Sequence, residues 1–145
     1  MTQVNRLLET ALYVADVDRS CEFYRRVLGL GPVIGPLAEG EIQNPSFRAL
    51  DMPGGQVLLL FRKGSAARAA VLPGGSIPAH DGNGRLHLAF AISLVELEAW
   101  RERLRSNGVA IEAEMKWYRG GTSLYFRDPD DHLVELATPG LWPTY

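Results

Sequence analysis

The chain of 145 residues contains an internal repeat, and this repeat restricts its possible folds more than any other feature. One copy begins with the apolar segment 8–14 and the other with segment 85–92. Polar residues, an amphipathic segment and a glycine then follow in the same order in both copies. Aligning the copies sets Glu9 over His87 and Leu59 over Glu135. We therefore expect two copies of one supersecondary unit.

The first copy has the pattern of a strand, a helix and three further strands. Residues 7–15 are rich in β formers and end at Asp16, a residue type that caps helices. Apolar side chains then recur at helical spacing up to Leu28, and Gly29 suits the end of the helix. Segments 32–36, 46–50 and 56–62 are predicted strands. The turn at 52–55 joins the last two as a hairpin.

The second copy repeats this order. Ser93 and Glu96 have the spacing of a capping box, which predicts a helix that ends at Asn107 and Gly108. Strands are expected at 85–92, 123–127 and 132–137, and a further strand is expected to begin at 109–111. Residues 63–84 are rich in Gly, Pro, Ala and Ser and predict a connection. The expected architecture is one α+β domain, 1–145, built from module one (1–62), the connection (63–84) and module two (85–145).

Composition excludes several classes of function. The net charge of −2 creates no positive electrostatic field that would attract nucleic acid. No apolar run approaches the roughly 20 residues of a membrane span, and the first residues lack the apolar segment of a secretory signal. A single cysteine, Cys21, cannot form an internal disulfide. We expect a cytoplasmic protein that contacts neither nucleic acid nor membrane.

Three side chains at equivalent positions of the repeat suggest a metal site. Glu9, His87 and Glu135 each lie within an apolar strand pattern, where an unpaired charge is costly. One divalent ion would satisfy all three, and two carboxylates with one imidazole suit Mn²⁺, Fe²⁺ or Zn²⁺. Each residue taken singly also fits a structural role, since strand glutamates often meet an arginine. His80 is a loop histidine that could add a fourth ligand or an acid, and His132 is expected at the surface after a turn.

Segment 116–123 combines aromatic residues, a cation, a hydroxyl and glycines just before a predicted strand. Such a loop could hold an anionic or carbonyl-bearing ligand over the metal, or it could be a hairpin turn with exposed side chains. The expected substrate-binding residues are Arg48, Trp117, Arg119, Ser123 and Tyr125.

Three motifs resemble the vicinal oxygen chelate superfamily, which includes glyoxalase I, fosfomycin resistance transferases, extradiol dioxygenases, methylmalonyl-CoA epimerase and bleomycin resistance proteins. The first is Tyr-Val-Ala-Asp-Val-Asp-Arg-Ser at 13–20, with Phe-Tyr at 23–24 and Val-Leu-Gly-Leu at 27–30. The second is His87, and the third is Tyr-Phe-Arg-Asp-Pro-Asp at 125–130 with Leu-Val-Glu-Leu at 133–136. The resemblance implies two β-α-β-β-β modules that form a U-shaped mixed sheet. It also implies a metal held at the positions of Glu9, His87 and Glu135, and often a homodimer.

Two departures from the superfamily pattern bear on the reaction. The first ligand position, histidine in most metal-using relatives, is Glu9, and the fourth ligand position of glyoxalase I is Leu59. The missing fourth ligand argues against the glyoxalase and epimerase reactions, and Glu9 makes a dioxygenase a poorer match. Glu9 and Glu135 are the candidate catalytic residues, with Glu9 as either a ligand or a base. A third departure, Asp131 in place of a turn glycine, should affect only its hairpin.

Two functions fit this pattern. The first is a metal-dependent enzyme that acts by Lewis-acid catalysis on a small oxygen-chelating substrate, as a lyase or isomerase, a transferase or a dioxygenase. The second is a metal-free protein that sequesters an antibiotic-like small molecule.

Overall fold

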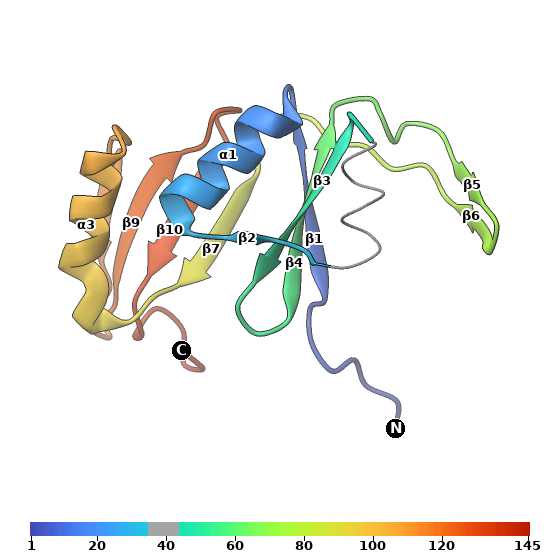
Figure 1. The fold of residues 1–145 in the computed structure, drawn as a ribbon. Coiled ribbons are helices and arrows are strands. Elements are labelled where there is room, and N and C mark those ends of the chain that lie inside the picture. The colour runs from blue at the N-terminus through green and yellow to red at the C-terminus, as the bar shows by residue number, and fades with distance from the viewer. Residues whose placement is uncertain (35–43) are drawn as a thin grey trace. The chain divides into compact units, whose positions relative to one another are not determined.

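The computed structural model describes residues 1–34 and 44–145, which divide into two compact units, Met1–Asn83 and Gly84–Tyr145. Unit one contains β1 (Glu9–Val14), α1 (Val17–Leu28), β2 (Gly31–Pro32), β3 (Phe47–Met52), β4 (Gln56–Arg62), β5 (Ala70–Leu72) and β6 (Gly75–Ile77) (Figure 1). Unit two contains β7 (His87–Ala91), the 3-10 turn η1 (Leu94–Glu96), α3 (Leu97–Ser106), β8 (Ala113–Lys116), β9 (Thr122–Arg127) and β10 (Leu133–Ala137).

The two units have the same sheet topology. The strand order is β1-β4-β3-β2 in unit one and β7-β10-β9-β8 in unit two. In these two four-stranded sheets β1 runs parallel to β4 and β7 parallel to β10, and the remaining pairs are antiparallel. A strand that returns parallel to the first needs a crossover, which the helix supplies. The predicted α+β class with two β-α-β-β-β units is confirmed.

Helix α1 packs on β3 and β4 and covers one face of the first sheet. The side chain of Asp16 accepts hydrogen bonds from the backbone of Asp18 and Arg19, and Gly29 closes the helix at φ 74°. Both helix ends are therefore as predicted. Alternation along the strands directs Leu50, Leu58 and Leu60 to this face, where they are fully buried.

The helix of unit two begins differently from the prediction. The Ser93 side chain makes no capping hydrogen bond, so the expected capping box is not formed. The Glu96 amide instead donates to the Ser93 carbonyl at 3.1 Å, which tightens the first turn into a 3-10 geometry. This bond satisfies an amide that the capping side chain would otherwise have served.

Two predicted strands begin elsewhere. Residues 109–111 are not a strand, because the Val109 amide donates to the Leu104 carbonyl and helps close α3, so that β8 starts only at Ala113. In unit one the strand predicted at 32–36 is reduced to β2 at Gly31–Pro32 among the described residues, and residues 35 and 36 lie outside them.

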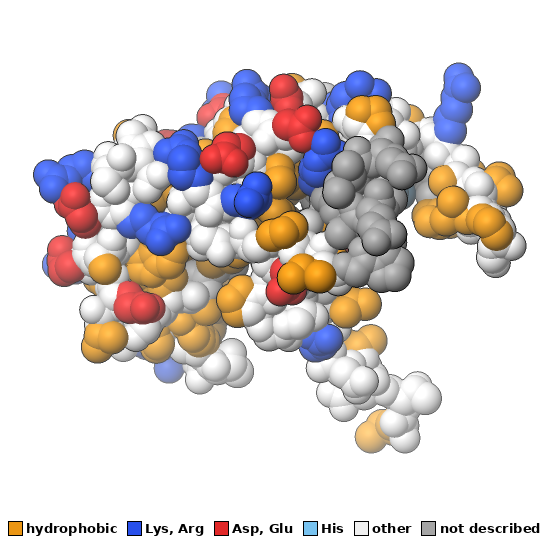
Figure 2. Space-filling model, in the orientation of Figure 1, with side chains coloured by type: hydrophobic (Ala, Val, Ile, Leu, Met, Phe, Trp, Pro, Cys, Tyr) orange, Lys and Arg blue, Asp and Glu red, His pale blue; other side chains and the backbone are white. Residues whose placement is uncertain are grey.

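The connection contains the β5–β6 hairpin, which the sequence did not predict. Its strands pair antiparallel, and its apolar side chains Val71, Leu72 and Ile77 are exposed (Figure 2). The connection groups with unit one as far as Asn83, and His80 contacts Tyr13 of β1. Within the described ranges, no helix has the length and apolar character needed to span a membrane.

We predict that Gly82→Ala destabilises the protein by about 1–3 kcal/mol, the usual cost of overpacking. A Cβ on Gly82 would lie 2.3 Å from a ring carbon of Tyr13, whereas a Cβ on Gly74 would meet nothing within 4 Å. Gly74→Ala is therefore the matched control and should change stability by less than about 0.5 kcal/mol. Urea unfolding of both variants measures the difference, and equal midpoints would show that segment 80–82 is not packed on Tyr13.

Candidate metal site and its neighbours

His87 and Glu135 lie on the same face of the second sheet. The register pairs His87 with Leu133 and Ala89 with Glu135, and side chains two apart on a strand share a face. Tyr125 is opposite Glu135 on β9 and lies on this face too. The other face carries the buried apolar side chains Leu124, Phe126, Val134 and Leu136.

The His87 and Glu135 side chains are in direct contact. The His87 Nε2 atom is 3.2 Å from Oε2 of Glu135, which is buried, whereas half of the His87 side chain is exposed. The His87 Nδ1 atom is 3.1 Å from the Leu133 carbonyl oxygen. A carbonyl only accepts, so Nδ1 carries a proton, and a neutral imidazole then presents a lone pair at Nε2. Nε2 and Oε2 are then two acceptors facing each other.

Two acceptors that face each other are stable only when a proton or a metal ion lies between them. A proton on Nε2 would make an imidazolium–carboxylate ion pair, and a metal ion would use both lone pairs. The contact with the Leu133 carbonyl suits metal binding, because histidines that bind a metal usually donate their other N–H to such a group. The geometry thus fits a cation bound by these two side chains.

Tyr125 holds the second oxygen of the same carboxylate. Its hydroxyl donates to Oε1 of Glu135 at 3.1 Å. Burial raises the pKa of the Tyr125 phenol above the usual 10.0, and Glu135 raises it further, while a hydrogen bond with Ser123 acts in the opposite direction. The phenol therefore remains a hydrogen-bond donor throughout the neutral range.

Trp117 and Ser123 extend this group of contacts. The Trp117 indole N–H donates to the Ser123 hydroxyl at 2.8 Å, and Ser123 is fully buried. Trp117 begins the tight turn between β8 and β9, in which its own amide donates to the Gly121 carbonyl. Three of the five predicted substrate-binding residues, Trp117, Ser123 and Tyr125, are therefore brought together beside Glu135.

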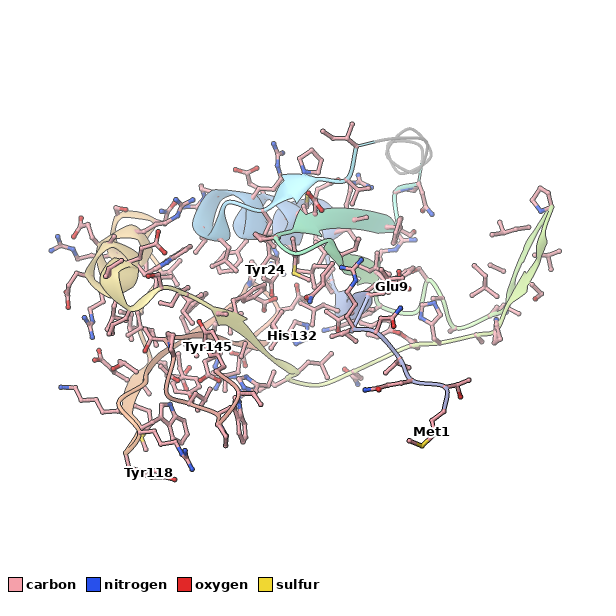
Figure 3. All side chains as sticks on the ribbon, turned by 90° about the horizontal axis from the view of Figure 1, so that it is seen from below. Met1, Glu9, Tyr24, Tyr118, His132 and Tyr145 are labelled. Atoms are coloured by element: carbon pink, nitrogen blue, oxygen red, sulfur yellow. The ribbon has the colours of Figure 1, made fainter. Side chains whose placement is uncertain are left out.

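The two predicted arginines lie elsewhere. Arg48 forms an ion pair with Asp18 of α1 at 2.6 Å, and its register partner is the buried Leu60, so it lies on the helix-covered face of its sheet. Arg119 lies in the turn after β8, where its guanidinium stacks 5.4 Å from the ring centre of Tyr118, which is 90% exposed (Figure 3).

Glu9 is the first residue of β1 in unit one (Figure 3). It is exposed, its register partner is Val57, and Leu59 lies two residues further along the same face. This repeats the relation of His87 to Leu133 and Glu135 in unit two. The described residues contain no group of three or more His, Cys, Asp or Glu side chains that could hold an ion. Of the expected ligands, the structure brings together His87 and Glu135.

The other two histidines have structural contacts. His132 is 1% exposed (Figure 3), and its Nδ1 accepts from the Leu86 amide at 3.0 Å, so the expectation of a surface residue is wrong. The preceding turn is closed by a hydrogen bond that the His132 amide donates to the Asp128 side chain. Asp131 adopts φ 68°, the left-handed conformation of the glycine it replaces. His80 Nδ1 is 2.8 Å from the Tyr13 hydroxyl.

A family model described as "Glyoxalase/Bleomycin resistance protein/Dioxygenase superfamily" matches residues 6–136. A metallothiol transferase, FosB of Staphylococcus epidermidis, is 31% identical over 129 residues, which are 88% of this chain and 79% of FosB. The crystal structure of a lactoylglutathione lyase from Agrobacterium tumefaciens is 31% identical with a TM-score of 0.82, covering 98% of this chain and 99% of the lyase.

A shorter match joins the chain to the fosfomycin resistance protein FosX of Listeria innocua. It is 43% identical over 51 residues, 34% of this chain and 38% of FosX. The chain thus matches little more than a third of that relative's length.

We predict that Tyr125 ionises above pH 10.0, because its pKa is raised by burial and by Glu135. An ultraviolet titration should show that Tyr125→Phe loses absorbance change from the alkaline end of the curve. Tyr118→Phe removes a phenol that is 90% exposed and serves as the control for losing one tyrosine. Loss of signal at or below pH 10 in Tyr125→Phe would contradict the buried contact with Glu135.

Proposed function

The chain belongs to the Glyoxalase/Bleomycin resistance protein/Dioxygenase superfamily, and we propose that it is a metal-dependent enzyme acting on a small substrate with neighbouring oxygen atoms. The observation that carries the proposal is the contact of His87 Nε2 with Glu135 Oε2 at 3.2 Å, in an arrangement that calls for a cation. The imidazole is already oriented by the Leu133 carbonyl.

The proposed ligands are Glu9, His87 and Glu135. For Glu9 the support is its register position, which repeats that of His87 in the other unit. One imidazole and two carboxylates suit Mn²⁺ or Zn²⁺, with Fe²⁺ a poorer match because the site would be formally neutral. Bound there, the ion would supply Lewis-acid stabilisation of a negatively charged oxygen.

The chain's own side chains have separate proposed roles. Tyr125 fixes the Glu135 carboxylate through Oε1 and leaves Oε2 beside His87. Ser123 is buried, so we assign it to positioning Trp117 and Tyr125. Trp117 is half-buried and presents an apolar surface for substrate. Glu9 is exposed, and we assign it the role of proton acceptor if it is not a ligand.

Among the possible reactions we favour a transfer reaction, because of the residue at position 59. One relative is a metallothiol transferase and another a lactoylglutathione lyase. Leu59 occupies the position in unit one that Glu135 occupies in unit two, and an alkyl group cannot bind a metal ion. A three-ligand site suits addition of a thiol or another nucleophile better than the lyase reaction. The compartment that we propose is the cytoplasm.

The alternative is a metal-free protein that binds a small molecule without changing it. The observation in its favour is that a protonated His87 would also satisfy the Glu135 carboxylate, as an ion pair. Such a pair would need no metal, and Glu9 would then have no part in it.

We also propose a homodimer. Strands β1 and β7 are edge strands of their sheets, and the β5–β6 hairpin exposes apolar side chains that contact with a second copy would cover. The tail residue Trp142 is 64% exposed and is a further candidate contact. Light scattering at micromolar protein gives the mass directly, and a monomer would reject the dimer.

We predict one divalent ion per chain in protein purified without a metal-chelating tag. His87→Ala should weaken its binding by at least about a hundredfold, since ligands contribute strongly to affinity. His80→Gln is the matched control, because His80 pairs with Tyr13 and should not affect the metal. Elemental analysis measures the metal content and calorimetric titration the metal affinity of each protein. Unchanged affinity in His87→Ala would contradict the assignment of His87 as a ligand.

The role of Glu9 is tested by two substitutions. If Glu9 is a ligand, Glu9→Gln should weaken metal binding strongly, and Glu9→His should retain it with a shift towards softer ions. If Glu9→Gln leaves metal affinity unchanged but abolishes turnover, Glu9 is a base and the ligand assignment is wrong at this position.

A further inference from the structure

Unit one contains a pocket of about 360 Å³ between the end of its sheet and the connection. Phe47, Phe61 and His80 are among the residues that line it. Arg62 and Arg68 are also among its lining residues. The volume is within the range of roughly 300–1,000 Å³ that small-molecule sites occupy.

The three rings are mutually arranged as aromatic clusters prefer. Phe47 and Phe61 are register partners on neighbouring strands, with ring centres 4.9 Å apart. The rings of Phe61 and His80 meet edge to face at 4.8 Å and 80°. Another flat ring could join this cluster by offset stacking or by an edge-to-face contact.

Two hydrogen bonds fix the position of His80. Its amide donates to the Ala66 carbonyl at 2.9 Å, and its Nδ1 atom is 2.8 Å from the Tyr13 hydroxyl. Tyr13 in turn stacks on Phe61 at 6.1 Å and is packed so tightly against Gly82 that no side chain fits there. The pocket is therefore formed before any ligand arrives, which lowers the entropic cost of binding.

The charge lining the pocket is positive. Arg62 and Arg68 form no ion pair with a carboxylate of the described part of the chain, and no Asp or Glu is among the described residues that line the pocket. Arginine binds carboxylate and phosphate groups with two parallel hydrogen bonds. The cations argue against a quaternary ammonium ligand, which aromatic rings alone would attract.

We propose that this pocket, lined by Phe47, Phe61, His80 and Arg68, binds a flat aromatic anion with its ring on Phe61 and its acidic group on Arg68. The site lies on the sheet face that also carries Glu9 but is four residues further along β1, at Tyr13. It requires no metal ion, so it stands or falls independently of the proposed enzyme activity.

Calorimetric titration with 2-naphthoate in the presence of EDTA tests the proposal. We expect saturable binding of one probe per chain. Arg68→Gln should weaken it about tenfold by removing a charge-assisted hydrogen bond, and Phe61→Leu about threefold to tenfold by removing a ring while keeping an apolar side chain. Neutral 2-naphthalenemethanol and non-aromatic cyclohexanecarboxylate should both bind more weakly than 2-naphthoate.

Arg103→Gln, which removes a cation from α3 in unit two, is the matched control and should leave the affinity unchanged. Arg68 is exposed, so its variant should fold normally, and thermal melts verify this for Phe61→Leu. The proposal is overturned by a lack of saturable binding at millimolar probe, by equal affinity in Arg68→Gln and wild type, or by equal affinity for all three probes.

Discussion

The parallel pairing of β1 with β4 in unit one, and of β7 with β10 in unit two, determines how the sheet of each unit is built. It forces the chain to cross over through a helix. In unit one this helix packs on β3 and β4, and the other face of the sheet is left for side chains with chemical roles. In unit two the free face carries His87, Glu135 and Tyr125. In unit one it carries Glu9 and the rings of Tyr13 and Phe61. The repeat thus supplies two similar faces that have diverged in their side chains.

The central feature of this face in unit two is the buried carboxylate of Glu135, each oxygen of which has a polar partner. Tyr125 donates to one oxygen of Glu135, and the other faces an imidazole whose N–H is already given to the Leu133 carbonyl. A buried carboxylate without a partner would cost several kcal/mol. The demand for a cation at Oε2 therefore arises from the way the strand register orients these three groups.

Much of this was predictable, because alternation in strands depends only on local sequence. The repeat is visible in the sequence, and alternation places Glu135 on one face of its strand with Leu133 and Ala137. The same rule could have assigned Arg48 to the face of Leu50. The common face of His87 and Glu135 depends also on the register of β7 with β10. Contacts made by distant segments could not be predicted. Tyr13 and His80 are 67 residues apart, and the position of β8 depends on how Val109 closes α3.

The most direct test of the central claim is the state of the His87 ring nitrogens, observed by ¹⁵N NMR before and after addition of Zn²⁺. The chain has three histidines, so the signal lost in His87→Ala identifies the ring. The account predicts a proton retained on Nδ1 and a shift of Nε2 when Zn²⁺ is added. A His87 spectrum unchanged by saturating Zn²⁺, or a ring with its only proton on Nε2, would contradict it.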